Sequence, residues 1–402
     1  MNILKHLPRS IKKLHKDIFP VYATGCYIYT PDKKKYLDLT SGIGALSLGH
    51  NHPHVTEKVT DQLTKYVHIP QQVFKSHPAQ VELTKKILNI SPSPKLDNIL
   101  YVNSGSEATD NAIKIARAST GKSNIISLNG GFHGRTLGAL SVTSSNLACT
   151  KNISPLISNI FFCPTPTKEA INQVLEFQSS PDNTAAIMFE TVQGDGGIFG
   201  INSEFIKYVR KICTENNILL IIDEVQCGSM RTGAWWSIEH SNVVPDIMTF
   251  GKGIANGYPL AGIIGTSDIM NSLQPGSLGG TYGGNAICSA AASATIDILN
   301  DSNIRINTIE MGRYITEQLK GEILIREIRQ YGLMIGIEFY DNTPEYSMKL
   351  VEELKKEGVL VLLCGNKSQY IRILPPLIIS KLEVDYFLEK FKKILDANRK
   401  IT

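Results

Sequence analysis

The chain has 402 residues, of which 42% are hydrophobic and 19% charged, and its formal net charge is +4. This length allows a large core and two domains, and the composition is ordinary for a soluble globular protein. So small a charge gives no reason to expect a nucleic-acid partner. No apolar run approaches the roughly 20 residues that cross a bilayer, so no membrane partner is expected either.

The cysteines and the N-terminus indicate the compartment. The seven cysteines are scattered and form no Cys-x-x-Cys pair. This favours free thiols over a disulfide framework or a zinc site, so we expect no metal. Residues 1–16 carry five basic and no acidic residues but no apolar signal-peptide core. We expect a cytoplasmic protein, with a short organellar presequence as the alternative.

The order of expected elements indicates the domains. Residues 1–52 predict an N-terminal arm with a helix and a small hairpin. Residues 53–300 alternate strands and helices, which favours a mostly parallel α/β sheet with helices on both sides; the strands are expected at 98–102, 124–128, 185–189, 218–222, 247–250 and 261–265. Residues 301–402 predict helix, strand (323–329), strand (333–339), helix (346–357), strand and helix. This order indicates a separate, small α+β domain that the N-terminal arm helps to complete.

Residues 101–117 form the first motif with a chemical implication. They predict a strand, a turn of small residues and an amphipathic helix. The N-terminus of such a helix offers unpaired N–H groups and a partial positive charge, which suit a phosphate. An ordinary capped helix is the alternative.

An acid and a lysine follow two later strands. Five aliphatic residues, 218–222, predict a strand buried on both faces, and Asp223 follows at the end where open sheets bind ligands. Lys252 stands between two glycines, which let the backbone approach a ligand closely. Pyridoxal phosphate (PLP) requires an acid for its ring nitrogen and a lysine for its aldehyde. The alternative for Asp223 alone is a residue that forms a turn, and the alternative for Lys252 alone is a solvated surface lysine.

Further motifs, at 131–136, 190–197, 279–285 and 371–377, follow in the same chain. In this order and spacing the set resembles the class III (ω-amino acid) aminotransferases of PLP fold type I, from about Phe19 to the C-terminal helix. The chain is most similar to 4-aminobutyrate aminotransferases, with acetylornithine and ornithine aminotransferases close behind. The resemblance implies a large PLP-binding domain with a mostly parallel, seven-stranded-type sheet, and a small α+β domain built from both termini.

The resemblance also implies the cofactor site. Lys252 would hold PLP as a Schiff base and move a proton during catalysis, and Asp223 would form an ion pair with the ring nitrogen. The other positions implied are Gly105 and Ser106 at the phosphate, Phe132 and Val225 on the two ring faces, Gln226 at the phenolate oxygen, Thr281 reaching the phosphate from a second subunit, and His133 as a further cofactor-binding residue. The expected assembly is therefore a homodimer or a dimer of dimers. If Thr281 is only a turn residue, this argument for a dimer fails.

The substrate residues implied are two arginines and their neighbours. Arg135 would hold the distal carboxylate of an ω-amino acid, and Arg372 the α-carboxylate of 2-oxoglutarate or glutamate, each through paired hydrogen bonds. Asp195 stands where the family usually has a glutamate that masks the second arginine. Glu190 is expected as a polar residue near the amine. Ile43 stands where ornithine aminotransferases tend to carry a tyrosine.

The sequence thus predicts an ω-aminotransferase that works in two ping-pong half-reactions. 4-Aminobutyrate would give its amine and leave as a semialdehyde, and 2-oxoglutarate would accept the amine and leave as glutamate. The alternative donors are N-acetylornithine, ornithine and diaminobutyrate. A PLP enzyme of this fold that does not transaminate is a further alternative. A catalytically silent binding protein is another, although such proteins usually lose the lysine or the aspartate, and both are present here.

Overall fold

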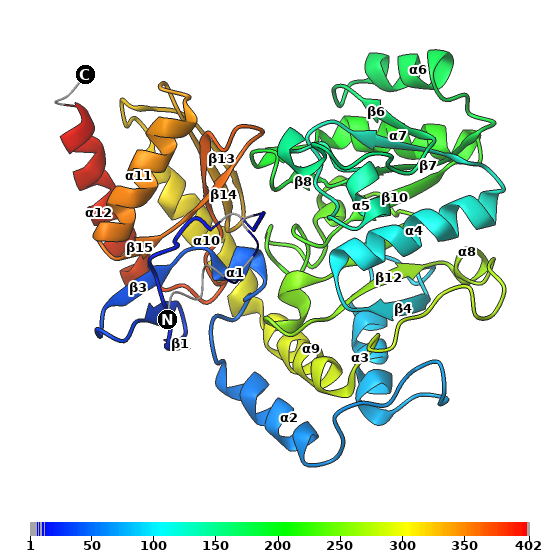
Figure 1. Ribbon diagram of the computed structural model, residues 1–402, viewed down its shortest axis with the longest axis horizontal. Helices are drawn as coiled ribbons and strands as arrows, with labels where there is room; N and C mark the ends of the chain where they lie inside the picture. Colours follow the sequence, from blue (N-terminus) through cyan, green and yellow to red (C-terminus); the bar gives the residue numbers. More distant parts are fainter. Residues whose placement is uncertain (1–5, 7, 9, 12, 400–402) are drawn as a thin grey trace.

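The computed structural model describes residues 6, 8, 10, 11 and 13–399, which form two lobes (Figure 1). The larger lobe is built on a seven-stranded sheet in the order β4-β12-β11-β10-β7-β5-β6. β12 is antiparallel to both of its neighbours, and the other neighbouring pairs are parallel. The strands are β4 (Asn98–Val102), β5 (Asn124–Leu128), β6 (Ile160–Cys163), β7 (Thr184–Phe189), β10 (Leu219–Asp223), β11 (Ile247–Phe250) and β12 (Ala261–Gly265).

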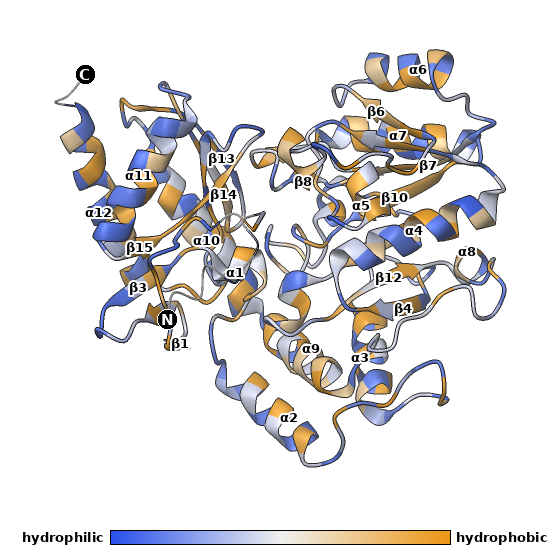
Figure 2. Ribbon diagram, in the orientation of Figure 1, coloured by the Kyte–Doolittle hydropathy of each residue, from blue (hydrophilic) through white to orange (hydrophobic). Residues whose placement is uncertain are grey.

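Helices cover both faces of this sheet, because side chains along each strand alternate between the two faces. Ile221 and Ile247 pack with α4 (Gly105–Thr120) on one face. Leu220 and Ile222 pack with α6 (Lys168–Phe177) and α7 (Ser203–Glu215) on the other. Figure 2 shows the strands β7 and β10 largely hydrophobic, while α4 and α6 alternate between hydrophobic and hydrophilic residues. The α/β architecture expected from the sequence is confirmed.

The smaller lobe contains two further sheets. One is the antiparallel sheet β13-β14-β17-β16, and the other is β1-β2-β3-β15. In the second sheet, β15 runs parallel to β3, so the two ends of the chain share one sheet. The bounds are β1 (Tyr22–Thr24), β2 (Tyr27–Tyr29), β3 (Lys35–Asp38), β13 (Ile325–Tyr331), β14 (Met334–Phe339), β15 (Val359–Leu360), β16 (Leu362–Cys364) and β17 (Tyr370–Ile373), with helices α10 (Ser302–Leu319), α11 (Pro344–Lys356) and α12 (Lys381–Arg399).

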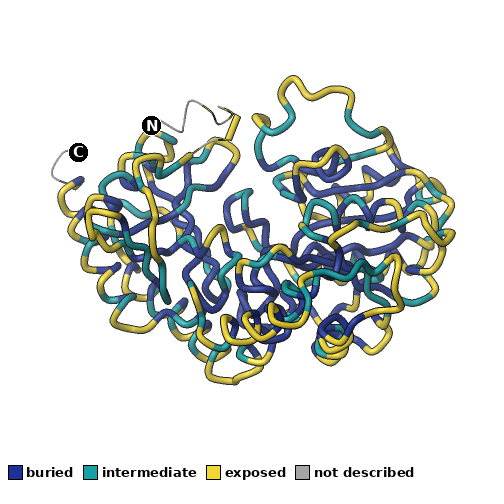
Figure 3. Tube along the Cα trace, turned by 60° about the horizontal axis from the view of Figure 1, so that its bottom comes forward, coloured by how far each residue is buried: buried dark blue, intermediate teal, exposed yellow. Residues whose placement is uncertain are grey.

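Further α-helices and β-strands connect these elements. They are α1 (Ser41–Gly44), α2 (Pro53–Leu63), α3 (Pro78–Asn89), α5 (Leu137–Ser141), α8 (Ser267–Met270), α9 (Ala286–Leu299), β8 (Val192–Gln193) and β9 (Phe199–Gly200). In Figure 3, buried segments form the interior of each lobe and exposed segments its outer surface. None of the described helices is long and apolar enough to span a membrane. Within the described residues, no group of His, Cys, Asp or Glu side chains is placed to hold a metal ion.

Most predicted strands agree with the structure. Those at 98–102, 124–128, 247–250 and 261–265 have the predicted bounds, while β10 begins and ends one residue later than predicted. Asp223 is therefore the last residue of the strand. Strand β6 was not predicted. The expected N-terminal helix falls partly outside the described residues, and the described residues before Ser41 contain no α-helix.

Candidate active site

A cavity of about 140 Å³ lies at one edge of the large sheet. Its lining residues follow the carboxyl ends of five strands: Ser104 follows β4, Phe132 follows β5, Glu190 follows β7, Val225 follows β10 and Lys252 follows β11. These strands run in one direction, so their carboxyl ends meet at one edge, where open α/β sheets bind their ligands. Residues far apart in the sequence are thus brought together by the sheet.

Asp223 is held in the cavity wall by three contacts. Its Oδ1 accepts hydrogen bonds from the Val225 N–H at 3.0 Å and from Thr249 Oγ1 at 3.2 Å. Its Oδ2 lies 2.7 Å from His133 Nδ1. Burial opposes protonation of His133, but the hydrogen bond and charge of Asp223 outweigh it and raise the pKa of this histidine. His133 Nε2 is buried and has no hydrogen-bond partner among the described residues. These contacts hold the carboxyl group of Asp223 in one position at the cavity.

Lys252 begins a short 3₁₀ turn, Lys252–Ala255, directly after β11 and Gly251. Its backbone is left-handed, with φ of 45°, an uncommon conformation for a residue with a side chain. Burial lowers the pKa of the amine, although the charges of Glu190 and Asp223 act in the opposite direction. A lowered pKa favours the neutral amine, which is the nucleophilic form.

The N-terminus of α4 forms another wall. Ser104 caps this helix by accepting a hydrogen bond from the Glu107 N–H at 3.2 Å, and Gly105 is the first helical residue. A Cβ atom on Gly105 would lie 2.7 Å from Val225 Cγ1, so only glycine fits beside Val225. The neighbouring Ser106 Oγ accepts the Arg135 N–H at 3.1 Å. The helix end therefore presents its first N–H groups without an intervening side chain.

Glu190 borders the cavity beside the loop of Phe132. Its carboxylate accepts the N–H groups of Phe132 at 2.9 Å and Gly194 at 3.2 Å. Burial raises the pKa of Glu190 to about 7, with Asp223 adding to the rise and His133 opposing it. Burial thus favours the protonated form of this carboxyl group, which lines the same cavity as Lys252.

A larger cavity of about 610 Å³ adjoins the first and shares Lys252, Gln226 and Phe132 with it. The predicted substrate residues that line it are Ile43, Arg135, Glu190, Asp195 and Arg372. Arg135 is exposed, and its guanidinium lies 5.8 Å from the centre of the Phe132 ring. The predicted substrate residues thus open onto the same space as the lysine.

Arg372, on β17, is buried but incompletely paired. Its Nη1 donates to Gln226 Oε1 at 3.3 Å, and its Nη2 lies 3.6 Å from Asp195 Oδ1. Its Nε is buried, and no group in the described part of the chain hydrogen-bonds to it. A buried guanidinium with unused donors is suited to a carboxylate ligand.

Thr281 is the predicted cofactor residue that this chain does not bring to its own cavity. It is exposed and lies in the segment before α9. It lines neither of the two cavities around Lys252. Its expected role across a subunit interface remains a prediction.

Several residues around the cavities were missed by the sequence analysis. Thr249 reaches Asp223 because the parallel register of β10 and β11 places the two side by side. Leu14 and Cys149 contribute apolar surface to the larger cavity. No local pattern marks these residues, because only the packing of distant segments brings them together.

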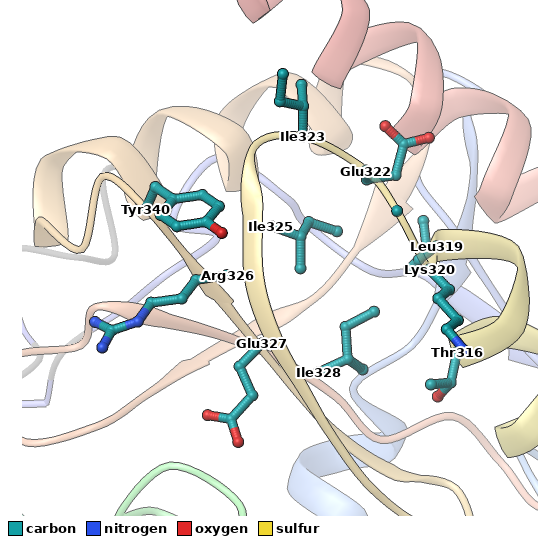
Figure 4. Close-up of a pocket in the computed structure, with 11 residues that line it drawn as sticks. Thr316, Leu319, Lys320, Glu322, Ile323, Ile325, Arg326, Glu327, Ile328 and Tyr340 are labelled. Atoms are coloured by element: carbon teal, nitrogen blue, oxygen red, sulfur yellow. The ribbon is translucent and has the colours of Figure 1, made fainter.

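Another cavity, of about 670 Å³, lies on the smaller lobe between the end of α10 and β13 (Figure 4). Ile323, Ile325, Ile328 and Tyr340 are among the side chains around it. All of its lining residues come from the smaller lobe, and none of the predicted site residues is among them. The site is therefore at the edge of the large sheet, where the titratable groups converge.

These groups fit PLP. The cavity provides an amine on Lys252, a carboxylate on Asp223 and the N-terminus of a sixteen-residue helix for a phosphate. A side chain at position 105 would collide with Val225, so the first residue of the helix carries none. Among the described residues the buried His133 Nε2 has no partner, which points to a missing polar group. The fold and the site together are those of a fold type I PLP enzyme.

Comparison with known proteins identifies the family. Residues 10–395 match the family described as Aminotransferase class-III, and the chain belongs to this family. It is 35% identical to a 5-aminovalerate aminotransferase of Pseudomonas putida, over 92% of this chain and 91% of the relative. It is also 35% identical to an acetylornithine aminotransferase of Archaeoglobus fulgidus, over 91% of this chain and 92% of that relative. With a 4-aminobutyrate aminotransferase of Escherichia coli the identity is 33%, over 97% and 96%.

A solved structure agrees with this assignment. The ornithine aminotransferase of Toxoplasma gondii superimposes with a TM-score of 0.91 at 26% identity, covering 100% of this chain and 94% of that one. The protein is therefore a PLP-dependent transaminase, which takes an amino donor and a 2-oxo acid of the 2-oxoglutarate type. The predicted family, fold, enzyme class and cofactor are confirmed.

Proposed function

We propose that this transaminase moves the amino group of an ω-amino acid, with 4-aminobutyrate as the first choice, to 2-oxoglutarate. The products are a semialdehyde and glutamate, formed in two ping-pong half-reactions. The observation that carries the proposal is that Arg135 and Arg372 line one cavity together with Lys252. Two arginines beside one reactive amine suit substrates whose carboxylates lie at different distances from the reacting carbon.

When bound, PLP supplies an aldehyde for the donor's amine and an electron-withdrawing ring. Lys252 is the residue proposed to hold the cofactor and then to carry the proton at the reacting carbon, and its lowered pKa supports this role. Asp223 would form an ion pair with the ring nitrogen, and His133 would orient that carboxylate through the 2.7 Å contact. Glu190 contributes a polar group near the amine.

The other cavity residues position the cofactor. Gly105 and Ser106 bind the phosphate at the N-terminus of α4. Phe132 and Val225 would cover the two faces of the ring, and Gln226 would donate to its phenolate oxygen. Both Val225 and Gln226 line the smaller cavity directly after β10, which supports these roles.

Each of the two arginines binds a different substrate carboxylate. Arg135 receives the distal carboxylate of the ω-amino acid, and Arg372 receives the α-carboxylate of 2-oxoglutarate. Asp195, 3.6 Å from Arg372, offsets its charge when the donor brings no α-carboxylate. Ile43 presents an aliphatic side chain to the same cavity, which suits a donor without an α-amino group.

N-acetylornithine is the second candidate donor. An aliphatic residue at Ile43 suits it equally, and the acetylornithine and 5-aminovalerate aminotransferases named above are as similar to this chain as the 4-aminobutyrate enzyme. Ornithine and diaminobutyrate follow as alternatives.

We also propose a homodimer or dimer of dimers in the cytoplasm, in which Thr281 completes the phosphate site of the neighbouring subunit. Its exposed position supports a contact with a second chain. The proposed domains are the arm at 1–52, the PLP-binding domain at 53–300 and the small domain at 301–402. The division is supported by the separate sheets of the two lobes.

The test follows the visible spectrum of the holoenzyme while single donors are added without a keto acid. We expect 4-aminobutyrate to bleach the yellow band and 2-oxoglutarate to restore it. Butylamine, with the same carbon chain but no carboxylate, is the matched control and should bleach the band poorly. If only N-acetylornithine or a diamine bleaches the band, the choice of donor is wrong while the transaminase mechanism stands.

A further inference from the structure

The carboxylate that faces Arg372 is held from the opposite side by a serine. Ser145 Oγ donates to Asp195 Oδ2 at 2.9 Å, while Asp195 Oδ1 stays 3.6 Å from Arg372 Nη2. Ser145 is 1% exposed, so its hydroxyl has little access to water. The aspartate is thus hydrogen-bonded to the serine and only loosely paired with the arginine.

The backbone on both sides fixes this geometry. The Ser145 N–H donates to the Gly131 carbonyl at 3.0 Å, in the loop that leads to Phe132. The Asp195 carbonyl accepts the Gly365 N–H of the smaller lobe at 2.8 Å. Because both backbones are anchored, the carboxylate can change partner only by turning its own side chain.

Arg372 is correspondingly available to a ligand. Its one close hydrogen bond among the described residues is to Gln226 Oε1, at 3.3 Å, and its buried Nε has no partner. Opposite charges 3.6 Å apart in a partly buried site attract strongly. Something must therefore oppose the closer approach of Asp195, and the hydrogen bond from Ser145 is the contact that does so.

We propose that Ser145 is a positioning residue that keeps Asp195 from closing onto Arg372, and so keeps the arginine ready for an α-carboxylate. This inference rests on the proposed role of Arg372 as the α-carboxylate site. Ser145 touches neither cavity itself and acts only through Asp195. Without its hydroxyl, the aspartate turns toward the arginine and competes with the incoming substrate.

The test measures binding of glutarate to the holoenzyme by calorimetry. Glutarate has the two carboxylates and chain length of 2-oxoglutarate but cannot react, so the measurement does not depend on turnover. We expect Ser145→Ala to weaken glutarate binding roughly tenfold, the size of effect of one charge-assisted hydrogen bond. Ser144→Ala is the matched control, because Ser144 Oγ instead accepts the Gly130 N–H, and it should bind glutarate normally. Unchanged glutarate affinity in Ser145→Ala overturns the proposal.

A double substitution separates this role from a structural one. In an Asp195→Ala background, Ser145→Ala should have no further effect on glutarate binding, because the residue through which the serine acts is absent. If Ser145→Ala still weakens glutarate binding tenfold in this background, the serine acts by shaping its own loop and the proposal fails. Ser145→Cys, similar in size but a weak donor, should shift binding in the same direction if the alanine variant does not fold.

Crystal structures of wild type and Ser145→Ala test the geometry without any substrate. In the variant, Asp195 should move within hydrogen-bonding distance of Arg372, and an unmoved aspartate refutes the idea. If 2-oxoglutarate fails to restore the amine-loaded wild-type enzyme, the proposed acceptor is wrong, while the crystal structures still decide the role of Ser145.

Discussion

Glu224 stands next to Asp223, yet the structure gives it a different task. Its carboxylate is 1% exposed and accepts the N–H groups of Ser237 at 2.9 Å and Ile238 at 2.8 Å. It forms no salt bridge with any of the described residues. Burial raises its pKa to about 8, although the two backbone hydrogen bonds act to lower it. We therefore expect Glu224→Gln to change how stability depends on pH while leaving the active site intact.

The sign follows from proton linkage. An acid whose pKa is raised in the folded state binds a proton on folding between its unfolded value, 4.5, and about 8. The free energy of unfolding therefore falls as pH rises through this window. At 1.36 kcal/mol per pKa unit, the loss is on the order of 5 kcal/mol. Glutamine carries no charge, so the variant should lack this loss and become more stable than wild type above pH 8.

Equilibrium unfolding in urea at several pH values between 5 and 9 measures the effect. The difference in unfolding free energy between Glu224→Gln and wild type should grow as the pH rises from 5 to about 8 and level off above it. The visible PLP band serves as the control for an intact site. If the two stability curves run parallel from pH 5 to pH 9, Glu224 is not a buried carboxyl group with a raised pKa, and the reasoning is refuted.

The remaining predictions concern the cofactor site. Lys252→Ala should abolish the Schiff-base absorption band and lower turnover by roughly 10³-fold or more. The control is Lys114→Ala, at an exposed lysine of α4, which should leave both unchanged. A Lys252→Ala enzyme with normal turnover would contradict the assignment. Asp223→Asn should lower kcat by on the order of 10²–10³-fold with little change in fold, measured by steady-state kinetics and circular dichroism, and an unchanged kcat would exclude a role at the ring nitrogen. Gly105→Ala should weaken PLP retention during dialysis and reduce the free energy of unfolding by about 1–3 kcal/mol. The reason is that its Cβ would lie 2.7 Å from Val225 Cγ1. Tight PLP binding in Gly105→Ala would show that Val225 can move to make room for the methyl group.

Where the sequence predicted the structure well, the evidence was local. Strand β11 could be predicted with its bounds because its residues are all buried and mostly apolar. Strand β6 was missed because it is a short edge strand that pairs only with β5 and stays partly exposed. Asp223 and Lys252 were found because each follows a buried strand, and strand ends of a parallel sheet gather at one edge.

Contacts between distant segments could not be predicted in this way. The hydrogen bond from Thr249 to Asp223 depends on the register of β10 against β11, which no residue within either strand specifies alone. The hydrogen bond from Ser145 to Asp195 joins two loops 50 positions apart. Neither serine nor threonine carries a periodic pattern that would mark such a partner.

The sequence by itself determined the fold class, because apolar periodicity is a property of the chain order, and its resemblance to a known family determined the PLP-binding chemistry. The roles of the two arginines are implied by the same resemblance and remain predictions. Only the tertiary structure decided that Arg372 keeps unused donors and that Asp195 is held by Ser145. It also decided that Glu224, although adjacent to Asp223, caps a different segment. The physical reason is that side-chain pairing and burial depend on how distant segments pack, and the free energies that tune the site arise from that packing.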